Sequence, residues 1–424
     1  MKLAFITPRY GADITAGPEH ACRLLAEHIG HRHEIEVVTT CARDSRGWKN
    51  DYPEGPDRVR GVRIRRFPVT EREPDPSALS HLAQRLLGEP HARGDELDWV
   101  RRRGPWAPGL IDHIKRQHRT YDALVFFGLT AATTVFGLPI APERSVLFPH
   151  LELKATLRFE LWSELLLMPR ALGLLATSER RLLHDFVRVQ PRNEELVGIG
   201  IEPSPQQAYP RHQQDPSDVI PVEDEIPGDA EPVADESYLS GRGMPFRRRH
   251  RLYGPIALYG GRVEPENGCQ EMLEYFDGYA STDGHMSLVL MGVKMMRVPE
   301  EPYLRQAGML PDRDRMIAYE AADITIAPSP DDLMAQTVLE SLAVGTPVLA
   351  SARNAAAVDH CRRANGGLFY ENREEFVEGL RILAGNPALR AQLGESGRRY
   401  VEQHYRWDSV LTRFERLMSR VAPR

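Results

Sequence analysis

The N-terminal half of the chain alternates between short apolar runs and longer segments with helical spacing. Residues 3–7 and 34–40 are apolar and rich in β-branched side chains, which is typical of buried strands. Between them, residues 19–29 carry apolar side chains at helical spacing. This βαβ opening predicts a parallel sheet. Further strands are expected at 62–67, 122–127, 145–148, 172–175 and 196–201, and the polar segment 71–109 is expected to hold one helix, near 79–87.

The C-terminal half repeats this alternation. Strands are expected at 255–259, 287–291, 324–327 and 367–370, and helices at 269–279, 313–322, about 334–343, 374–383, 387–393 and 394–405. Gly345 is a natural left-handed cap for the third of these helices. A second parallel, doubly wound sheet follows, and a last helix is expected at 407–421.

A proline-rich and acidic stretch separates the two halves. Residues 203–236 have no hydrophobic period, which indicates a surface insertion or a segment that docks a partner. The expected organisation is an N-terminal Rossmann-like domain (1–201), an insertion or linker (202–250), a C-terminal Rossmann-like domain (251–405) and a final helix (406–424) that packs back on the first domain.

Composition narrows the class of protein. The 424 residues carry a net charge of −6 and a pI near 6.2, which argues against nucleic-acid binding. The four cysteines lack C-x-x-C spacing, so a reducing compartment and no structural zinc are expected. The N-terminus reads as a strand, and the longest apolar stretch is interrupted by charge. We therefore expect a cytoplasmic protein, with peripheral contact at the inner membrane face as an open alternative.

The strand that ends at Ala327 leads into the most informative segment. Pro328 and Pro330 stop the strand, and a helix follows, so the amides of Met334, Ala335, Gln336 and Thr337 are expected to face a phosphate. In open α/β sheets, ligands bind outside the carboxyl ends of strands. Asp332 and Glu340 flank the start of this helix, which predicts that both face one ligand.

The pattern Asp332-x7-Glu340, followed by Ser-Leu-Ala-x-Gly-Thr-Pro-Val, resembles the E-x7-E block of family 4 retaining glycosyltransferases. The resemblance spans nearly the whole chain and implies the α/β GT-B fold. In that fold two Rossmann-like, doubly wound domains face an interdomain cleft, and a C-terminal helix crosses back to the first domain.

The resemblance also implies roles for residues of the second domain. Gly261 and Arg262 match a Gly-Arg-(x)4-Lys-Gly phosphate clamp in which Asn267 stands where the family has lysine. Arg262 would neutralise the leaving diphosphate. Glu340 would accept hydrogen bonds from the ribose, and Asp332 would lie near the donor sugar.

Three further glycine and histidine positions complete the implied site. Gly308 falls in a loop, 306–311, that would contact the nucleobase through its backbone. Gly17, in the first β–α loop, lets the backbone approach donor or acceptor without a β-carbon clash. His150 ends a first-domain strand and is expected beside the reacting sugar.

These residues imply a retaining, front-face transfer from a nucleoside diphosphate sugar, UDP-linked by preference, to a hydroxyl or amine. No metal and no cofactor are expected, and Asp312-Arg-Asp314 is interpreted as helix capping. The acceptor is a glycan, a lipid or a small natural product. A homodimer or a partner protein could use residues 203–236.

Two alternatives stay open. Asn267 and Asp332 also fit a catalytically weakened homologue that serves as a binding or regulatory subunit. A phosphorylase-like enzyme or a nucleotide-binding epimerase could share the fold.

Overall fold

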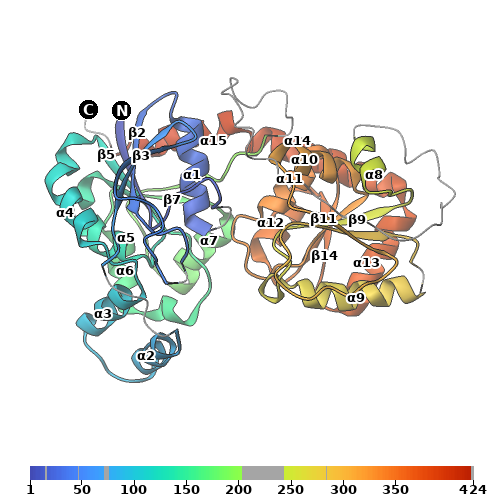
Figure 1. Ribbon diagram of the computed structural model, residues 1–424, viewed down its shortest axis with the longest axis horizontal. Helices are drawn as coiled ribbons and strands as arrows, with labels where there is room; N and C mark the ends of the chain where they lie inside the picture. The colour runs from blue at the N-terminus through green and yellow to red at the C-terminus, as the bar shows by residue number, and fades with distance from the viewer. Residues whose placement is uncertain (15–16, 46, 71–75, 203–242, 283, 422–424) are drawn as a thin grey trace. The chain divides into compact units, whose positions relative to one another are not determined.

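The computed structural model describes residues 1–14, 17–45, 47–70, 76–202, 243–282 and 284–421 (Figure 1). The chain divides into two compact units. Unit 1 comprises Met1–Gly200 and Trp407–Arg424, and unit 2 comprises Ile201–Arg406. The segment predicted as an insertion, 203–236, lies outside the described residues.

Unit 1 is built on an eight-stranded sheet with the order β3-β4-β2-β1-β5-β6-β7-β8. Its strands are β1 (Lys2–Ile6), β2 (Glu34–Thr40), β3 (Gly55–Val59), β4 (Val62–Phe67), β5 (Ala123–Phe127), β6 (Ser145–Phe148), β7 (Ala171–Leu174) and β8 (Glu194–Leu196). All neighbouring strands are parallel except β3 and β4, which form an antiparallel hairpin. The central strands β1, β5 and β6 are almost wholly buried, as their continuous apolar runs predict.

The helices of unit 1 lie between these strands in sequence, three of them between β4 and β5, and one follows unit 2. They are α1 (Gly17–Ile29), α2 (Pro76–Gly88), α3 (Arg93–Arg103), α4 (Pro108–Gln117), α5 (Ala132–Gly137), α6 (Glu160–Leu167), α7 (Thr177–Arg181) and α15 (Trp407–Met418). The sequence predicted a single helix in the segment 71–109, and this was wrong. The helix α3 is also present, and it buries Trp99 and Val100 although its surface is densely charged.

The helix α15 belongs to unit 1 although it follows all of unit 2 in sequence. Trp407 stacks on His28 of α1 with ring centroids 3.5 Å apart, and Gly200 leaves room for the indole, because a β-carbon there would lie 2.3 Å from it. Phe414 is fully buried against Phe5 of β1, with ring centroids 6.1 Å apart. These contacts make α15 part of the core of unit 1.

Unit 2 contains a six-stranded, wholly parallel sheet with the order β11-β10-β9-β12-β13-β14. Its strands are β9 (Ile256–Gly260), β10 (Ser287–Met291), β11 (Leu304–Gly308), β12 (Ile324–Ala327), β13 (Val348–Ser351) and β14 (Gly367–Tyr370). The predicted loop 306–311 is wrong at its start, because β11 extends through Gly308; the strand was missed since only Leu304 of its five residues is buried. The chain moves from β9 toward β11 and then returns to β12 on the other side of β9.

The helices of unit 2 are α8 (Met244–Arg249), α9 (Cys269–Thr282), α10 (Asp312–Ala321), α11 (Gln336–Val344), α12 (Ala355–Ala364), α13 (Arg373–Gly385) and α14 (Pro387–His404). The sequence predicted a break in α14 at Gly394, but the helix continues through it. A β-carbon at Gly394 would lie 1.9 Å from the carbonyl oxygen of Gly345. Glycine is therefore required at this point by the close approach of α14 to the left-handed end of α11, and not by a helix break.

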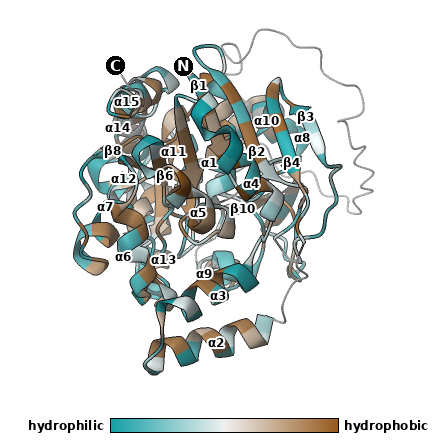
Figure 2. Ribbon diagram, turned by 90° about the vertical axis from the view of Figure 1, so that its left-hand side faces the viewer, coloured by the Kyte–Doolittle hydropathy of each residue, from teal (hydrophilic) through white to brown (hydrophobic). Residues whose placement is uncertain are grey.

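Figure 2 shows apolar and polar residues interspersed along α2, whose Ala83 and Leu86 are buried while Leu87 is exposed.

In the described part of the chain, no helix has the length and apolar character needed to cross a membrane. All four cysteines are buried and free of disulfides.

Candidate functional site

The strand order of unit 2 creates a switch point between β9 and β12. The chain leaves these neighbouring strands in opposite directions, and ligands of open α/β sheets bind outside the carboxyl ends of the strands at such a point. Gly261 and Arg262 follow β9 directly, and the Pro328–Pro330 turn follows β12. Most of the predicted donor-binding residues therefore come from these two adjacent loops.

Glycines hold the loops close together. Gly268 has φ of +72°, and a β-carbon there would lie 2.5 Å from the Pro328 carbonyl oxygen. Gly261 has φ of +150°, and its carbonyl oxygen would be only 1.9 Å from a β-carbon at Gly292, in the loop after β10. Three consecutive loops of the sheet edge thus meet at contacts that only glycine permits.

The predicted phosphate clamp forms a compact polar cluster. Arg262 Nη2 lies 2.9 Å from Glu264 Oε1, and the arginine side chain is 54% exposed. Asn267 Nδ2 donates to the Arg262 carbonyl oxygen at 3.0 Å and to Glu264 Oε1 at 3.1 Å. Asn267 therefore fixes the loop from within, and Arg262 is the exposed cation of the cluster.

Asp332 acts on the backbone that follows it. Its Oδ1 accepts hydrogen bonds from the amides of Met334 at 3.2 Å and Ala335 at 3.0 Å. Ala335 has φ of +42°, a left-handed conformation rare for alanine, and α11 begins at Gln336. The prediction that Met334 and Ala335 offer their amides to a phosphate is corrected, because Asp332 engages both. The helix starts two residues later than predicted for the same reason.

The first turn of α11 begins with Gln336, Thr337 and Val338. The amides of Thr337 and Val338 have no carbonyl partner within the helix, since the residues four positions earlier lie before its start. Asn354, the N-cap of α12, donates to the carbonyl oxygens of Ser329 at 3.0 Å and Asp332 at 3.2 Å, so it braces the loop before this turn. The sequence analysis did not identify Asn354.

Glu340 lies one turn further along α11, and its side chain is only 5% exposed. Its Oε1 accepts from Arg315 Nη2 at 2.7 Å and from Gln336 Nε2 at 2.9 Å. Arg315 comes from α10 and was missed by the sequence analysis, because an arginine in a charged helix start resembles a solvated surface residue.

Gly308 ends β11 with φ of +67°, and its carbonyl oxygen accepts from the Gly292 amide at 2.8 Å. Met309 follows it and is 68% exposed. Val293 and Met295, in the loop after β10, are 43% and 53% exposed and hydrogen-bond through their backbone to Val263. An exposed apolar cluster of Val293, Met295 and Met309 therefore lies at the same edge of the sheet as Arg262.

The two remaining predicted residues lie at the carboxyl edge of unit 1. Gly17 opens α1 after β1 with φ of +75°. His150 follows β6 with φ of +54°. The intervening loop after β5 joins them: a β-carbon at Gly128 would lie 3.1 Å from Pro18, and Leu129 donates to the Pro149 carbonyl oxygen at 2.8 Å. Gly17 and His150 thus lie in the two loops that flank and contact the loop after β5.

Two carboxylates missed by the sequence analysis surround His150. His150 Nε2 lies 3.3 Å from Glu152 Oε1, and Lys154 pairs with the other oxygen. Burial alone would raise the pKa of Glu152, but the hydrogen bonds from His150 and Lys154 lower it to about 2. Glu179 is fully buried, which raises its pKa, and it accepts from the amides of Leu151 at 2.9 Å and Leu175 at 2.7 Å.

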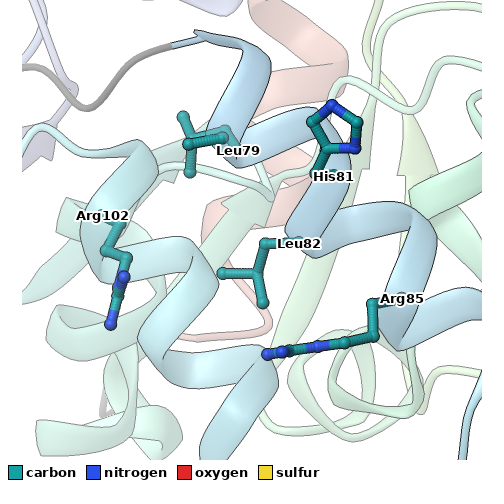
Figure 3. Close-up of a pocket in the computed structure, with 6 residues that line it drawn as sticks. Leu79, His81, Leu82, Arg85 and Arg102 are labelled. Carbon is teal, nitrogen blue, oxygen red and sulfur yellow. The ribbon is translucent and has the colours of Figure 1, made fainter.

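A pocket of about 380 Å³ lies elsewhere on unit 1, between α2 and α3. Leu82 and Arg85 extend from α2 toward α3, which carries Arg102 (Figure 3). None of the predicted site residues lines it. It is therefore not the predicted donor site.

No cluster of three or more His, Cys, Asp or Glu side chains suited to a metal occurs among the residues that the structure describes. The helix α10 begins at Asp312 with Pro311 at its N-cap position, where no side-chain hydrogen bond is made. The predicted capping by Asp312 is therefore corrected: this residue lies in the first turn.

Comparisons with known proteins agree with this geometry. Residues 245–400 match the family described as glycosyl transferases group 1, a region that contains every predicted residue of unit 2. This part of the chain is therefore similar to a glycosyltransferase domain, in agreement with the sequence analysis.

Similar solved structures cover the whole chain. Sucrose-phosphate synthase from Thermosynechococcus elongatus aligns with a TM-score of 0.65 and 15% identity, over 99% of this chain and 98% of that chain. Anabaena HepE in complex with UDP aligns with a TM-score of 0.67 and 12% identity, over 99% and 100%. A trehalose-6-phosphate protein from E. coli bound with UDP-2-fluoro glucose aligns with a TM-score of 0.61 and 12% identity, over 100% of each chain. These likenesses confirm the predicted GT-B fold with its two Rossmann-like sheets.

Proposed function

We propose that this chain is a retaining glycosyltransferase that moves a sugar from a nucleoside diphosphate sugar, with UDP as the favoured nucleotide, to a hydroxyl or amine acceptor. The observation that carries the proposal is that Arg262 follows β9, while α11 with Glu340 follows the neighbouring strand β12, at the switch point of the sheet. Cation, helix N-terminus and carboxylate are the three groups that a nucleoside diphosphate requires.

In this proposal each part of the donor has its own partner. The diphosphate binds Arg262 and the first-turn amides of α11 at Gln336 and Thr337. The ribose hydroxyls bind Glu340. The nucleobase lies over Gly308 and the apolar cluster of Val293, Met295 and Met309, because methionine side chains make favourable contacts with aromatic rings. Asp332 lies near the donor sugar and also shapes the loop before α11.

The reaction needs no protein nucleophile. The bond between the anomeric carbon and the diphosphate breaks with both electrons leaving on the diphosphate, which Arg262 stabilises. The acceptor oxygen or nitrogen then bonds to the oxocarbenium-like carbon on the same face and gives its proton to the departing phosphate oxygen. Positioning and charge stabilisation supply the rate enhancement, so neither a metal nor another cofactor is required.

The acceptor is proposed to bind unit 1 at the edge that carries Gly17 and His150. His150 is braced by Glu152 and lies in the loop after β6. A glycan, a lipid headgroup or a small natural product would fit this assignment. The UDP preference is supported by the similar fold of proteins solved with UDP or a UDP-sugar. We place the enzyme in the cytoplasm, with peripheral contact at the inner membrane face. We assign residues 203–236 to the docking of a partner.

A panel of UDP-, GDP-, TDP- and ADP-sugars tests the proposal. In buffer with EDTA, at least one donor should raise the melting temperature and be hydrolysed slowly, since water can replace the acceptor. The released sugar should first appear with the donor's anomeric configuration in a time-resolved NMR spectrum. Absence of binding to every donor would refute the proposal. Binding without turnover, with turnover gained in Asn267→Lys, would instead identify a weakened homologue.

A further inference from the structure

An ion pair joins α10 to α11 inside the candidate donor site. Arg315 Nη2 lies 2.7 Å from Glu340 Oε1, and Gln336 Nε2 donates to the same oxygen at 2.9 Å. The Glu340 side chain is 5% exposed, whereas that of Arg315 is 31% exposed. The arginine thus reaches from the surface to a nearly buried carboxylate.

Two donors on one oxygen fix the carboxylate plane. Gln336 lies four residues before Glu340 in the same helix. Its contact by itself would fix the Glu340 side chain only relative to α11. The Arg315 contact comes from a different helix and ties Glu340 to the segment that follows β11. A buried ion pair is a poor source of net stability, but it specifies geometry well.

The position of the pair along the sheet edge suggests its purpose. Arg315 lies in α10, six residues after Met309, which follows the left-handed Gly308. Glu340 lies one turn beyond the first-turn amides of α11. The pair therefore joins the helix that follows the loop assigned to the base to the helix that offers its amides to the phosphates, and a nucleotide carries its ribose between base and phosphates.

We propose that Arg315 is the positioning residue that orients Glu340 toward the ribose diol, so that the site prefers ribonucleoside diphosphates over their 2′-deoxy counterparts. This inference rests on the proposed function, since it assumes a nucleoside diphosphate at this edge. Arg315 acts through Glu340 and need not touch the donor. When a 2′-deoxy nucleotide binds, the oriented Glu340 carboxylate loses the hydrogen bond from the 2′-hydroxyl, so the deoxy form binds less tightly.

Calorimetric titration with UDP, GDP and ADP, each paired with its 2′-deoxy form, tests the inference. The wild-type protein should bind one ribonucleotide at least about tenfold more tightly than its deoxy form, which corresponds to one hydrogen bond to a charged group. Arg315→Met should weaken the binding of the ribonucleotide by about tenfold and that of the deoxy form far less, so that the ratio of the two affinities approaches one. Arg315→Lys, which keeps the cation, should restore part of the ratio. Arg398→Met, which removes an exposed arginine from a helical pair with Glu395, is the matched control and should leave the ratio unchanged.

The outcomes separate the inference from the function on which it rests. If no nucleoside diphosphate binds the wild-type protein, both fail. If one binds with the same affinity as its deoxy form, or if Arg315→Met lowers both affinities by the same factor, the proposed function stands and the role of Arg315 is refuted. Melting temperatures recorded for each variant show whether a loss of binding is only a loss of folding.

Discussion

At the residue scale, Asp332 shows that a residue predicted to bind the donor can also stabilise the local backbone. The sequence places it as the first carboxylate of a donor site, and the structure shows its Oδ1 capping the amides of Met334 and Ala335. These hydrogen bonds hold Ala335 in its left-handed conformation. The single side chain thus shapes the turn that delivers the first amides of α11.

Asp332→Ala and Asp332→Asn should therefore differ in stability. The alanine variant loses the acceptor and should be destabilised by about 1 kcal/mol, whereas asparagine keeps a side-chain oxygen and should lose only a few tenths. Urea unfolding of both variants checks this. Equal unfolding midpoints for the two variants would mean that the cap contributes nothing.

Glu152 gives a pH-dependent prediction in unit 1. Its pKa in the folded protein, about 2, is lower than the ordinary 4.5, so ionisation is favoured by folding. The resulting stability, about 2–3 kcal/mol, is present above pH ~4.5 and is lost as the pH falls toward 2. Glu152→Gln should be less stable than the wild type at pH 7, and the difference should shrink between pH 5 and 2. A difference that is constant with pH would contradict the ion pairs with His150 and Lys154.

At the scale of elements, the sequence predicts most strands because parallel strands buried on both faces are continuous apolar runs. It fails at β11, an edge strand in which only Leu304 is buried, and at α3, whose charges hide the buried Trp99 and Val100. The ends of α11 and α14 depend on contacts distant in sequence, such as Gly394 against Gly345. The same limit explains why Arg315 escaped prediction: its partner Glu340 is on another helix.

Gly268 tests whether the two loops of the donor site must touch. Gly268→Ala would place a β-carbon 2.5 Å from the Pro328 carbonyl oxygen and push the loops apart. Gly61→Ala, at φ of +82° with no atom within 4 Å, introduces similar backbone strain in the β3–β4 turn without a clash. Calorimetry should show nucleotide binding weakened about tenfold or more in the first variant and unchanged in the second. Similar affinities in the two variants would show that the contact is unnecessary.

At the scale of the whole molecule, the chain enters unit 1, forms unit 2 and returns to unit 1 through α15. The sequence predicts this return helix from its place and length, and it resembles the crossing helix of GT-B proteins. The aromatic contacts of Phe414 with Phe5 and Phe148, at 6.1 and 6.3 Å between ring centroids, show that α15 completes the core of unit 1.

Phe414→Ala should therefore destabilise unit 1 by about 3–5 kcal/mol, the usual cost of removing a buried phenyl ring. Hydrogen exchange should show faster exchange in β1 and β6, while β9 and β12 of unit 2 keep their protection. Thr412→Ala, on the exposed face of the same helix, should change stability by less than about 0.5 kcal/mol. Equal loss of protection in both units would contradict the assignment of α15 to unit 1.

Our central proposal is that the β9–β12 edge of unit 2 binds a nucleoside diphosphate through Arg262 without a metal. Calorimetric titration of UDP in EDTA into the wild type and Arg262→Met tests it directly, with Arg398→Met as the control. We predict binding by the wild type and the control, and an affinity about 10- to 100-fold lower in Arg262→Met, since the guanidinium contributes charged hydrogen bonds to the diphosphate. Equal affinity in the wild type and Arg262→Met, or binding only when a divalent cation is added, would contradict it.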